Sequence, residues 1–250
     1  MSTTTALPQT WRGLEFQTED VDVYAPKPAS LLAAEIATAN IPPGSRVLDA
    51  CTGSGVIGIA IASLVPGAEV TVSDVNEKSL AEARKNAARN GAVIRTVASD
   101  FYAGFADDAF DFVTVHPPAV PYPPDTDWGL SAGMRVATDG GSDGSHLVSR
   151  SILEARRVIR PGGRLLLLLP HWSNIHTAYG HLRQHYQGVR ELARREVEFF
   201  PAREGVSRPR LINHLRALAA AGLIEMSFDA PVPLSWVSVV EATVIKDPAG

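Results

Sequence analysis

The chain has 250 residues, of which 45% are hydrophobic and 20% are charged, and its formal net charge is −4. This length and composition are typical of one globular α/β domain and not of a disordered chain. The negative net charge argues against a nucleic-acid partner and against binding to an anionic membrane surface. A single cysteine excludes an internal disulfide framework and a cysteine-rich zinc site.

Neither the opening stretch nor the most hydrophobic run of the chain suggests export or membrane insertion. The opening stretch MSTTTALPQTWRG lacks the basic and apolar regions of a signal peptide. The most hydrophobic run, RLLLLLP, is too short to cross a bilayer and lies between Arg164 and Pro170. We therefore expect a cytoplasmic protein without a membrane partner, and we interpret RLLLLLP as a central strand that is covered on both faces.

Helical and strand patterns alternate along the chain after a polar N-terminal tail over residues 1–19. The apolar spacing, caps and terminating glycines predict helices over residues 28–39, 55–65, 76–91, 146–159, 175–186 and 208–221. Runs of β-branched and apolar residues predict strands over residues 45–50, 68–75, 92–100, 110–118, 164–170, 197–200 and 237–245.

This alternation predicts the α/β class, with a doubly wound, mostly parallel sheet of seven strands and right-handed crossovers. We expect one domain over residues 20–250. The stretch over 119–145 is rich in Pro, Gly, Asp and Ser, and long loops of this kind usually carry function. A helical insertion is expected over about residues 203–222, before the last strand.

The stretch RVLDACTGSGVIGIAIA, from Arg46 to Ala62, joins the first predicted strand to a helix through a glycine turn. Its Gly53-x-Gly55-x-x-Gly58 spacing fits a dinucleotide fingerprint, so a nicotinamide-dependent oxidoreductase is one interpretation. However, Asp49 stands directly before the turn. A carboxylate that faces the site would repel a pyrophosphate, whereas it can receive a cationic ligand directly or through water.

Two further carboxylates follow the next two strands. Asp74 ends the second strand, where a carboxylate can accept hydrogen bonds from ribose hydroxyls. Asp100 ends the third strand, where it can receive an adenine amino group while Phe101 packs on the ring. Together with Asp49, these residues predict a cationic amino acid joined to adenosine. S-adenosylmethionine fits this description better than NAD does.

Four segments carry a resemblance to a known family. They are VLDACTGSGVIGIAIA, VTVSDVNEKSLAEARKNAARNG, DVYAPKPASLLAAEI and DGGSDG, the last from Asp139 to Gly144. In order and spacing they resemble the class I methyltransferases, and within them the family that methylates glutamine side-chain amides in release factors. The resemblance covers roughly residues 20–170 and implies the Rossmann-like class I fold with S-adenosylmethionine as cofactor.

The same resemblance implies which residues contact the cofactor. Cys51 stands where a glycine is usual, and we interpret it as a small buried residue beside the methionine part of the ligand. With the three aspartates and Phe101, the expected cofactor-binding residues are Tyr24, Cys51, Thr52, Gly53, Gly55 and Val75.

The family's catalytic motif after the fourth strand is Asn-Pro-Pro-Tyr, and this chain has His116, Pro117, Pro118 and Ala119 there. In the family, the asparagine oxygen and the first proline carbonyl hold a planar amino group. A neutral histidine accepts only one hydrogen bond, so this grip on an amide is lost. His116 and Pro117 are the predicted catalytic residues. The imidazole acts either as a general base or as a group that positions the acceptor through a hydrogen bond.

The remaining candidates lie in the substrate loop and in the C-terminal segment. Tyr122 and Trp128 are predicted to wall in a small or peptide-like substrate, and Asp125 or Asp127 to receive a cationic one. Most histidines lie at or beyond residue 171, but no cysteine or carboxylate accompanies them at a convincing spacing, so no metal site is expected. The insertion is a candidate for an active-site cover or a homodimer contact.

The sequence therefore predicts an S-adenosylmethionine-dependent transferase that methylates a nitrogen or oxygen of a small molecule or peptide in a biosynthetic pathway. Four alternatives stay open. They are protein glutamine N5-methylation, a non-methylating use of the sulfonium such as cyclisation, a nicotinamide-dependent oxidoreductase, and a cofactor-binding module without catalysis.

Overall fold

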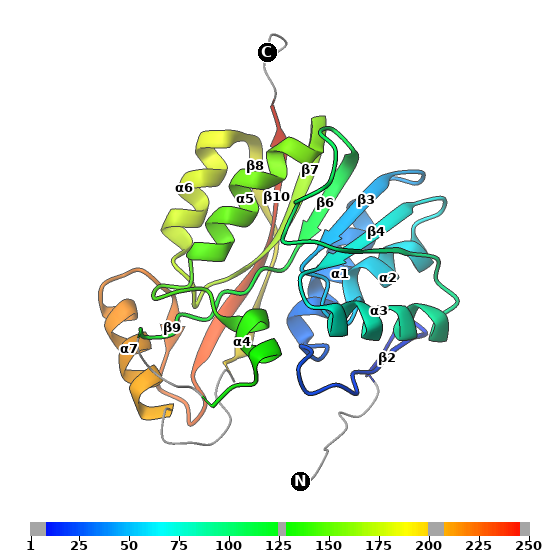
Figure 1. Ribbon diagram of the computed structural model, residues 1–250. Coiled ribbons are helices and arrows are strands. Elements are labelled where there is room, and N and C mark those ends of the chain that lie inside the picture. The colour runs from blue at the N-terminus through cyan, green and yellow to red at the C-terminus, as the bar shows by residue number, and fades with distance from the viewer. Residues whose placement is uncertain (1–8, 125–128, 200–207, 246–250) are drawn as a thin grey trace.

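A computed structural model describes residues 9–124, 129–199 and 208–245. Its centre is a sheet in the order β5-β4-β3-β6-β7-β10-β8, with the short β9 paired to β10 (Figure 1). The first four neighbouring pairs along this order are parallel, whereas β10 runs antiparallel to β7, β8 and β9. The predicted α/β fold with a mostly parallel seven-stranded path is thus confirmed.

The strands of the central sheet are β3 (Arg46–Ala50), β4 (Glu69–Asp74), β5 (Arg95–Ala98), β6 (Phe110–Val115), β7 (Ile159–Pro170), β8 (Tyr186–Glu198), β9 (Met226–Ser227) and β10 (Leu234–Val244). The helices are α1 (Pro28–Asn40), α2 (Val56–Leu64), α3 (Glu77–Arg89), α4 (Ala132–Thr138), α5 (His146–Val158), α6 (Ile175–His185) and α7 (Arg208–Ala220). All six predicted helices are therefore present, with small shifts at their ends.

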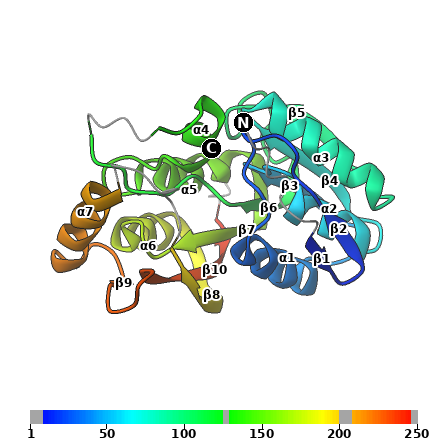
Figure 2. The same ribbon diagram turned by 90° about the horizontal axis from the view of Figure 1, so that it is seen from below.

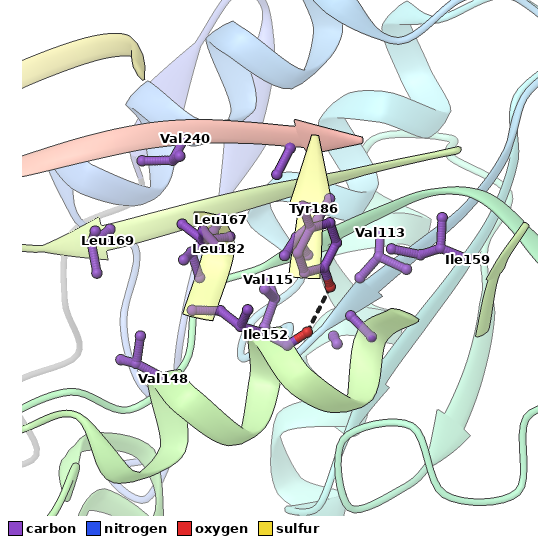
Figure 3. Packing of buried hydrophobic residues seen from close by; sticks show 14 of the residues in the cluster. Val113, Val115, Val148, Ile152, Ile159, Leu167, Leu169, Leu182, Tyr186 and Val240 are labelled. Carbon is purple, nitrogen blue, oxygen red and sulfur yellow. Dashed lines mark hydrogen bonds between the residues drawn. The ribbon is translucent and has the colours of Figure 1, made fainter. Parts of the chain in front are cut away.

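Helices cover both faces of the sheet, which explains the near-continuous apolar run in β7. Leu165, Leu167 and Leu169 pack against α5 and α6 on one face, as Figure 3 shows for Leu167 and Leu169. Leu166 and Leu168 point to the other face, where residues of α1 and α2 bury them. Tyr186 belongs to the cluster under α5 and α6, and its hydroxyl donates to the carbonyl of Ile152 at 2.6 Å (Figure 3).

The expected polar tail over residues 1–19 is wrong for its described part. β1 (Gln9–Trp11) and β2 (Leu14–Phe16) form a hairpin, and the chain then runs along α3. Backbone N–H groups of residues 15, 17 and 19 donate to the side chains of Asn90, Asn86 and Glu82 at 2.8 to 3.1 Å. These acceptors are four residues apart, so they form one polar row on α3.

Three other expectations needed correction. The predicted loop over 119–145 contains α4, which Ser131 caps by accepting the Met134 N–H at 3.3 Å. The strand predicted over residues 164–170 begins earlier, at Ile159, and includes Gly162 with a φ of +73°. The strand expected near 197–200 is only the end of β8, which begins at Tyr186.

α7 lies between β8 and β10 in the chain, as expected for the insertion, although residues 200–207 lie outside the described ranges. In both views α7 sits at the opposite end of the molecule from α3 (Figures 1 and 2). Among the described helices, none combines the length and the apolar character needed to cross a bilayer.

Candidate functional site

A cavity of about 590 Å³ lies where β3, β4, β5 and β6 end, at the edge at which doubly wound sheets bind their ligands. The segment before α1, the glycine turn and α4 complete its walls. The structure brings ten of the predicted site residues to this cavity, namely Tyr24, Cys51, Thr52, Gly53, Asp74, Val75, Asp100, Phe101, His116 and Pro117.

Asp49 does not face the cavity as predicted. Its side chain is buried beneath the glycine turn, where Oδ2 accepts from Thr52 Oγ1 at 2.6 Å and from the Gly58 N–H at 3.0 Å. Oδ1 accepts from Thr114 Oγ1 of β6 at 2.8 Å. Burial raises the pKa of Asp49 to about 6, while the three hydrogen bonds oppose this rise. The carboxylate thus braces the turn and the start of α2.

Asp74 does line the cavity. Its Oδ2 accepts from the Gly53 N–H and its Oδ1 from the Asn76 N–H, both at 2.9 Å. Burial raises the pKa of Asp74, and these backbone donors partly oppose the effect. Each oxygen keeps acceptor capacity, so this carboxylate is positioned to receive hydroxyl groups from a ligand.

Gly55, a predicted contact residue, shapes the turn without lining the cavity. Its φ of +89° lies in the left-handed region, and an added Cβ would come within 2.7 Å of Ile59 Cδ1. Cys51 also has a positive φ, of +55°. Burial, followed by the nearby Asp74, raises the pKa of the Cys51 thiol well above its usual value. The thiol is therefore protonated at neutral pH and is not an activated nucleophile.

His116 lies at the other end of the cavity, directly after β6. The Tyr24 ring meets it edge-on, with 6.1 Å between the ring centroids. Within the described ranges, no group hydrogen-bonds to the imidazole. The ring is partly exposed to the cavity, yet burial lowers the pKa of His116 to about 4. The imidazole is consequently neutral at pH 7, with one free acceptor nitrogen and one N–H donor.

The DGGSDG segment fixes the backbone that follows His116. Gly140 lies so close to Ala119 that an added Cβ would come within 2.6 Å of the Ala119 Cα. The Val120 N–H donates to the Thr138 carbonyl at 2.8 Å, and the Gly140 N–H donates to the Val120 carbonyl at 2.9 Å. Only glycine at this position permits such an approach, so the segment sets where the His116-Pro117-Pro118 stretch lies.

The predicted substrate contacts in the loop are not supported. Tyr122 is not among the residues that line the cavity, and it is buried in a cluster with Phe199, Leu211, Leu215 and Ile224. Its hydroxyl lies 3.4 Å from Thr138 Oγ1. The apolar ring is thus part of the packing under α7. Trp128, Asp125 and Asp127 lie outside the described residues.

The segment before α1 and the helix α4 lie side by side in both views (Figures 1 and 2), and both contribute residues to the cavity wall. An added Cβ on Gly133 would come within 2.4 Å of the Asp22 carbonyl oxygen. That oxygen accepts from Asn76 Nδ2 at 3.1 Å, while the Asp22 carboxylate pairs with Lys78. Asp22 therefore joins the N-terminal segment to both α3 and α4. We name residues 20–26 the N-terminal strap.

Sequence analysis missed several cavity residues because no local motif marks them. The cavity wall also includes Asn76, Arg135, His146 and Trp172. Arg135 is 3.6 Å from Asp139 and belongs to the unexpected helix α4. Trp172 follows β7 and packs against Phe199, with 5.2 Å between ring centroids.

No three His, Cys, Asp or Glu side chains gather at metal-binding distance within residues 9–124, 129–199 and 208–245. His181 and His185 are four residues apart on α6 and stack with 6.4 Å between their ring centroids. Positive side chains in the described part of the cavity wall bear on which ligand the glycine turn can hold. Among the described cavity residues, the one Arg or Lys is Arg135 on α4, so the turn lacks a cation for a pyrophosphate.

Comparison with known proteins adds to this geometry. The family "Methyltransferase small domain" matches residues 20–122. The release factor glutamine methyltransferase of Gloeobacter violaceus is 34% identical over 63% of this chain and 57% of that protein. Its counterpart in Bordetella pertussis is 34% identical over 70% of this chain and 66% of that protein.

A solved structure agrees in fold. The Thermus thermophilus 16S rRNA N2 G1207 methyltransferase, in complex with AdoMet and guanosine, superposes with a TM-score of 0.56 and 16% identity. The superposition covers 95% of this chain and 50% of that one. This chain therefore has the fold of the class I S-adenosylmethionine-dependent methyltransferases, and residues 20–122 match their small-domain family.

The cavity fits the cofactor of this class, S-adenosylmethionine, on its own chemistry. Asp74 offers a carboxylate beside the turn, and Asp100 offers a second one at the end of β5. The chain spans 57% to 66% of the length of the two curated relatives, so their activity is carried over below as a proposal only.

Proposed function

We propose that this methyltransferase modifies a nitrogen or oxygen atom of a peptide or small-molecule acceptor, and that His116 receives the proton of that atom. The observation that supports this proposal is the His116 ring itself. It lines the cavity, it has no hydrogen-bonding partner among the described groups, and the low pKa of His116 keeps it neutral. An acceptor N–H or O–H would satisfy its free nitrogen.

When bound, S-adenosylmethionine supplies a methyl group on a positively charged sulfur. The chain's own residues have three tasks beside it. Asp74 and Asp100 hold the nucleoside end, and Pro117 and Pro118 stiffen the backbone that positions the acceptor. His116 accepts a hydrogen bond from the acceptor and takes its proton as the acceptor atom gains the methyl group. Because burial disfavours the charged imidazole, His116 releases this proton readily after product leaves.

Protein glutamine N5-methylation is the second candidate, and the names of the two curated relatives favour it. In this case the amide of a glutamine side chain would donate to His116 and to the Pro117 carbonyl. The replacement of asparagine by histidine removes one acceptor of the family's grip, so the two candidates differ in what position 116 must provide.

The substitutions His116→Asn and His116→Gln separate the candidates. Turnover is measured with methyl-tritiated cofactor and a panel containing a release factor, glutamine peptides and small-molecule amines and alcohols. For an acceptor that needs a base, both variants lose about 100-fold or more in turnover. Their affinity for S-adenosylhomocysteine stays at the wild-type value. For protein glutamine methylation, His116→Asn retains or raises activity on the release factor, while His116→Gln does not.

His181→Ala is the matched control, because His181 lies on α6 outside the cavity. Wild-type turnover in His116→Gln would contradict the proposed proton transfer. Mass spectrometry of the acceptor and of the cofactor after the reaction also distinguishes a methylated acceptor from a cyclised fragment of the cofactor.

A further inference from the structure

Arg150 of α5 holds Asp100 at the nucleoside end of the cavity. Its Nη1 donates to Asp100 Oδ1 at 2.8 Å and to Oδ2 at 2.9 Å. The other side of the guanidinium is fixed as well, since Nε donates to Glu154 Oε1 at 2.6 Å. Asp100 lines the cavity whereas Arg150 does not, so the arginine can act on a ligand only through its neighbours.

Phe101 is the second neighbour of Arg150. The guanidinium carbon lies 4.9 Å from the centroid of the Phe101 ring, in a cation–π arrangement. Phe101 also lines the cavity, and its backbone has a φ of +50°, which is rare for a bulky residue. One arginine thus contacts both residues that the sequence assigns to the adenine ring.

These contacts are not explained by stability alone. The Asp100 side chain is 54% exposed and that of Arg150 is 34% exposed. An exposed ion pair of this kind contributes little to folding. What the contact does is fix the orientation of a carboxylate that would otherwise rotate freely, and each oxygen keeps a lone pair for a ligand.

We propose that Arg150 is a positioning residue that holds Asp100 and Phe101 in place to recognise the 6-amino group of adenine. Its effect is to set the discrimination between a 6-amino and a 6-oxo purine nucleoside. A 6-amino group donates to the fixed carboxylate, whereas a 6-oxo group presents a second acceptor to it and is repelled. The inference rests on the proposed placement of the cofactor against Asp100.

The test compares binding of S-adenosylhomocysteine and its deaminated analogue S-inosylhomocysteine by titration calorimetry. We expect wild-type protein to prefer the adenine compound by about tenfold or more, the range of a hydrogen bond to a charged group. Asp100→Asn should lose most of this preference. Arg150→Met should lose most of it too, although it leaves the Asp100 carboxylate in place.

Two further variants show which property of Arg150 sets the preference for the adenine compound. Arg150→Lys keeps the charge without the planar fork and should retain only part of the preference. Glu154→Gln keeps an acceptor oxygen for Arg150 Nε and removes only a negative charge that does not touch Asp100, so it should keep the wild-type ratio. Thermal unfolding of each variant shows whether it is folded, and the ratio of two affinities is unaffected by a fraction of inactive protein.

A wild-type ratio in Arg150→Met together with a lost ratio in Asp100→Asn would overturn the role of Arg150 and leave the placement of Asp100 standing. A wild-type ratio in Asp100→Asn would overturn both. Neither result affects the His116 experiments, which measure turnover.

Discussion

The glycine turn and the acceptor end of the same cavity are built in opposite ways. Every polar group of Asp49 and Asp74 that the structure describes already has partners within the protein. The imidazole of His116, in contrast, has no hydrogen-bonding partner among the residues that the structure describes, and it lines the cavity. The turn is therefore preorganised for one constant ligand, whereas the acceptor end depends on the substrate to complete it.

Asp49→Ala tests the fixed half of this comparison and should have the largest effect. The substitution leaves the buried donors of Thr114 and Gly58 without an acceptor and removes a negative charge from the N-terminus of α2. We expect the free energy of unfolding to fall by about 3 kcal/mol. Urea unfolding measures this change. Asp107→Ala, which breaks an exposed pair with Arg157, is the control and should cost less than about 1 kcal/mol.

Asp74→Ala sharpens the comparison, because this residue belongs both to the turn and to the ligand site. The Gly53 N–H loses its acceptor, and the ligand loses a carboxylate. The affinity for S-adenosylhomocysteine should fall by about 10- to 100-fold in titration calorimetry. Glu77→Ala, an exposed change just along the chain, should stay within about twofold. Unchanged binding in Asp74→Ala would remove the main support for the assigned nucleoside end.

Gly133→Ala tests the junction between the two halves. The added methyl group would overlap Asp22 and push α4 away from the N-terminal strap. Overpacking of this kind costs about 1 to 3 kcal/mol, so dissociation of S-adenosylhomocysteine should be about tenfold faster in stopped-flow experiments. Gly180→Ala is the control, since nothing lies within 4 Å of a Cβ there. Equal dissociation rates in the two variants would show that this contact does not retain the ligand.

The smallest change is expected in the NMR signals of His116 between about pH 8 and 5.5. Burial lowers the pKa of His116 to about 4, from 6.5 in the unfolded chain. Between pH 6.5 and 4 the unfolded chain binds a proton at His116 that the folded chain does not bind. His116 therefore lowers the free energy of unfolding as pH falls from 6.5 towards 4, and it does not change this free energy above pH 6.5. Its NMR resonances, assigned by comparison with His116→Gln, should stay constant from about pH 8 to 5.5. A titration midpoint near pH 6.5 in these NMR spectra would contradict the burial of the His116 ring.

The sequence predicted the parallel half of the sheet well because β3, β4 and β6 are largely buried apolar runs, and helix signals flank β3 and β4. It did not predict most of β8, whose alternating charges fit a strand with one exposed face that pairs, among the described strands, with β10 alone. The hairpin of β1 and β2 was also missed. Its one local signal is the Arg12-Gly13 turn, in which both residues have positive φ.

The site shows the same limit more sharply. The position of Asp49 after a strand indicates an important carboxylate, but not whether it faces the cavity or the turn. Thr114, which decides this, lies 65 residues further along the chain. Tyr122 was misassigned for a similar reason, since the residues that bury it come from the distant segment around α7. Contacts between remote segments, and not local patterns, determine both cases.

The position of α7 has a consequence for how such proteins can diversify. It is inserted between two antiparallel neighbours, β8 and β10, so its length can change without altering the order of any strand. Its apolar face nevertheless reaches Val120, four residues beyond His116. A change in α7 would thus alter the surroundings of the acceptor end and leave Asp74 and Asp100 at the nucleoside end in place.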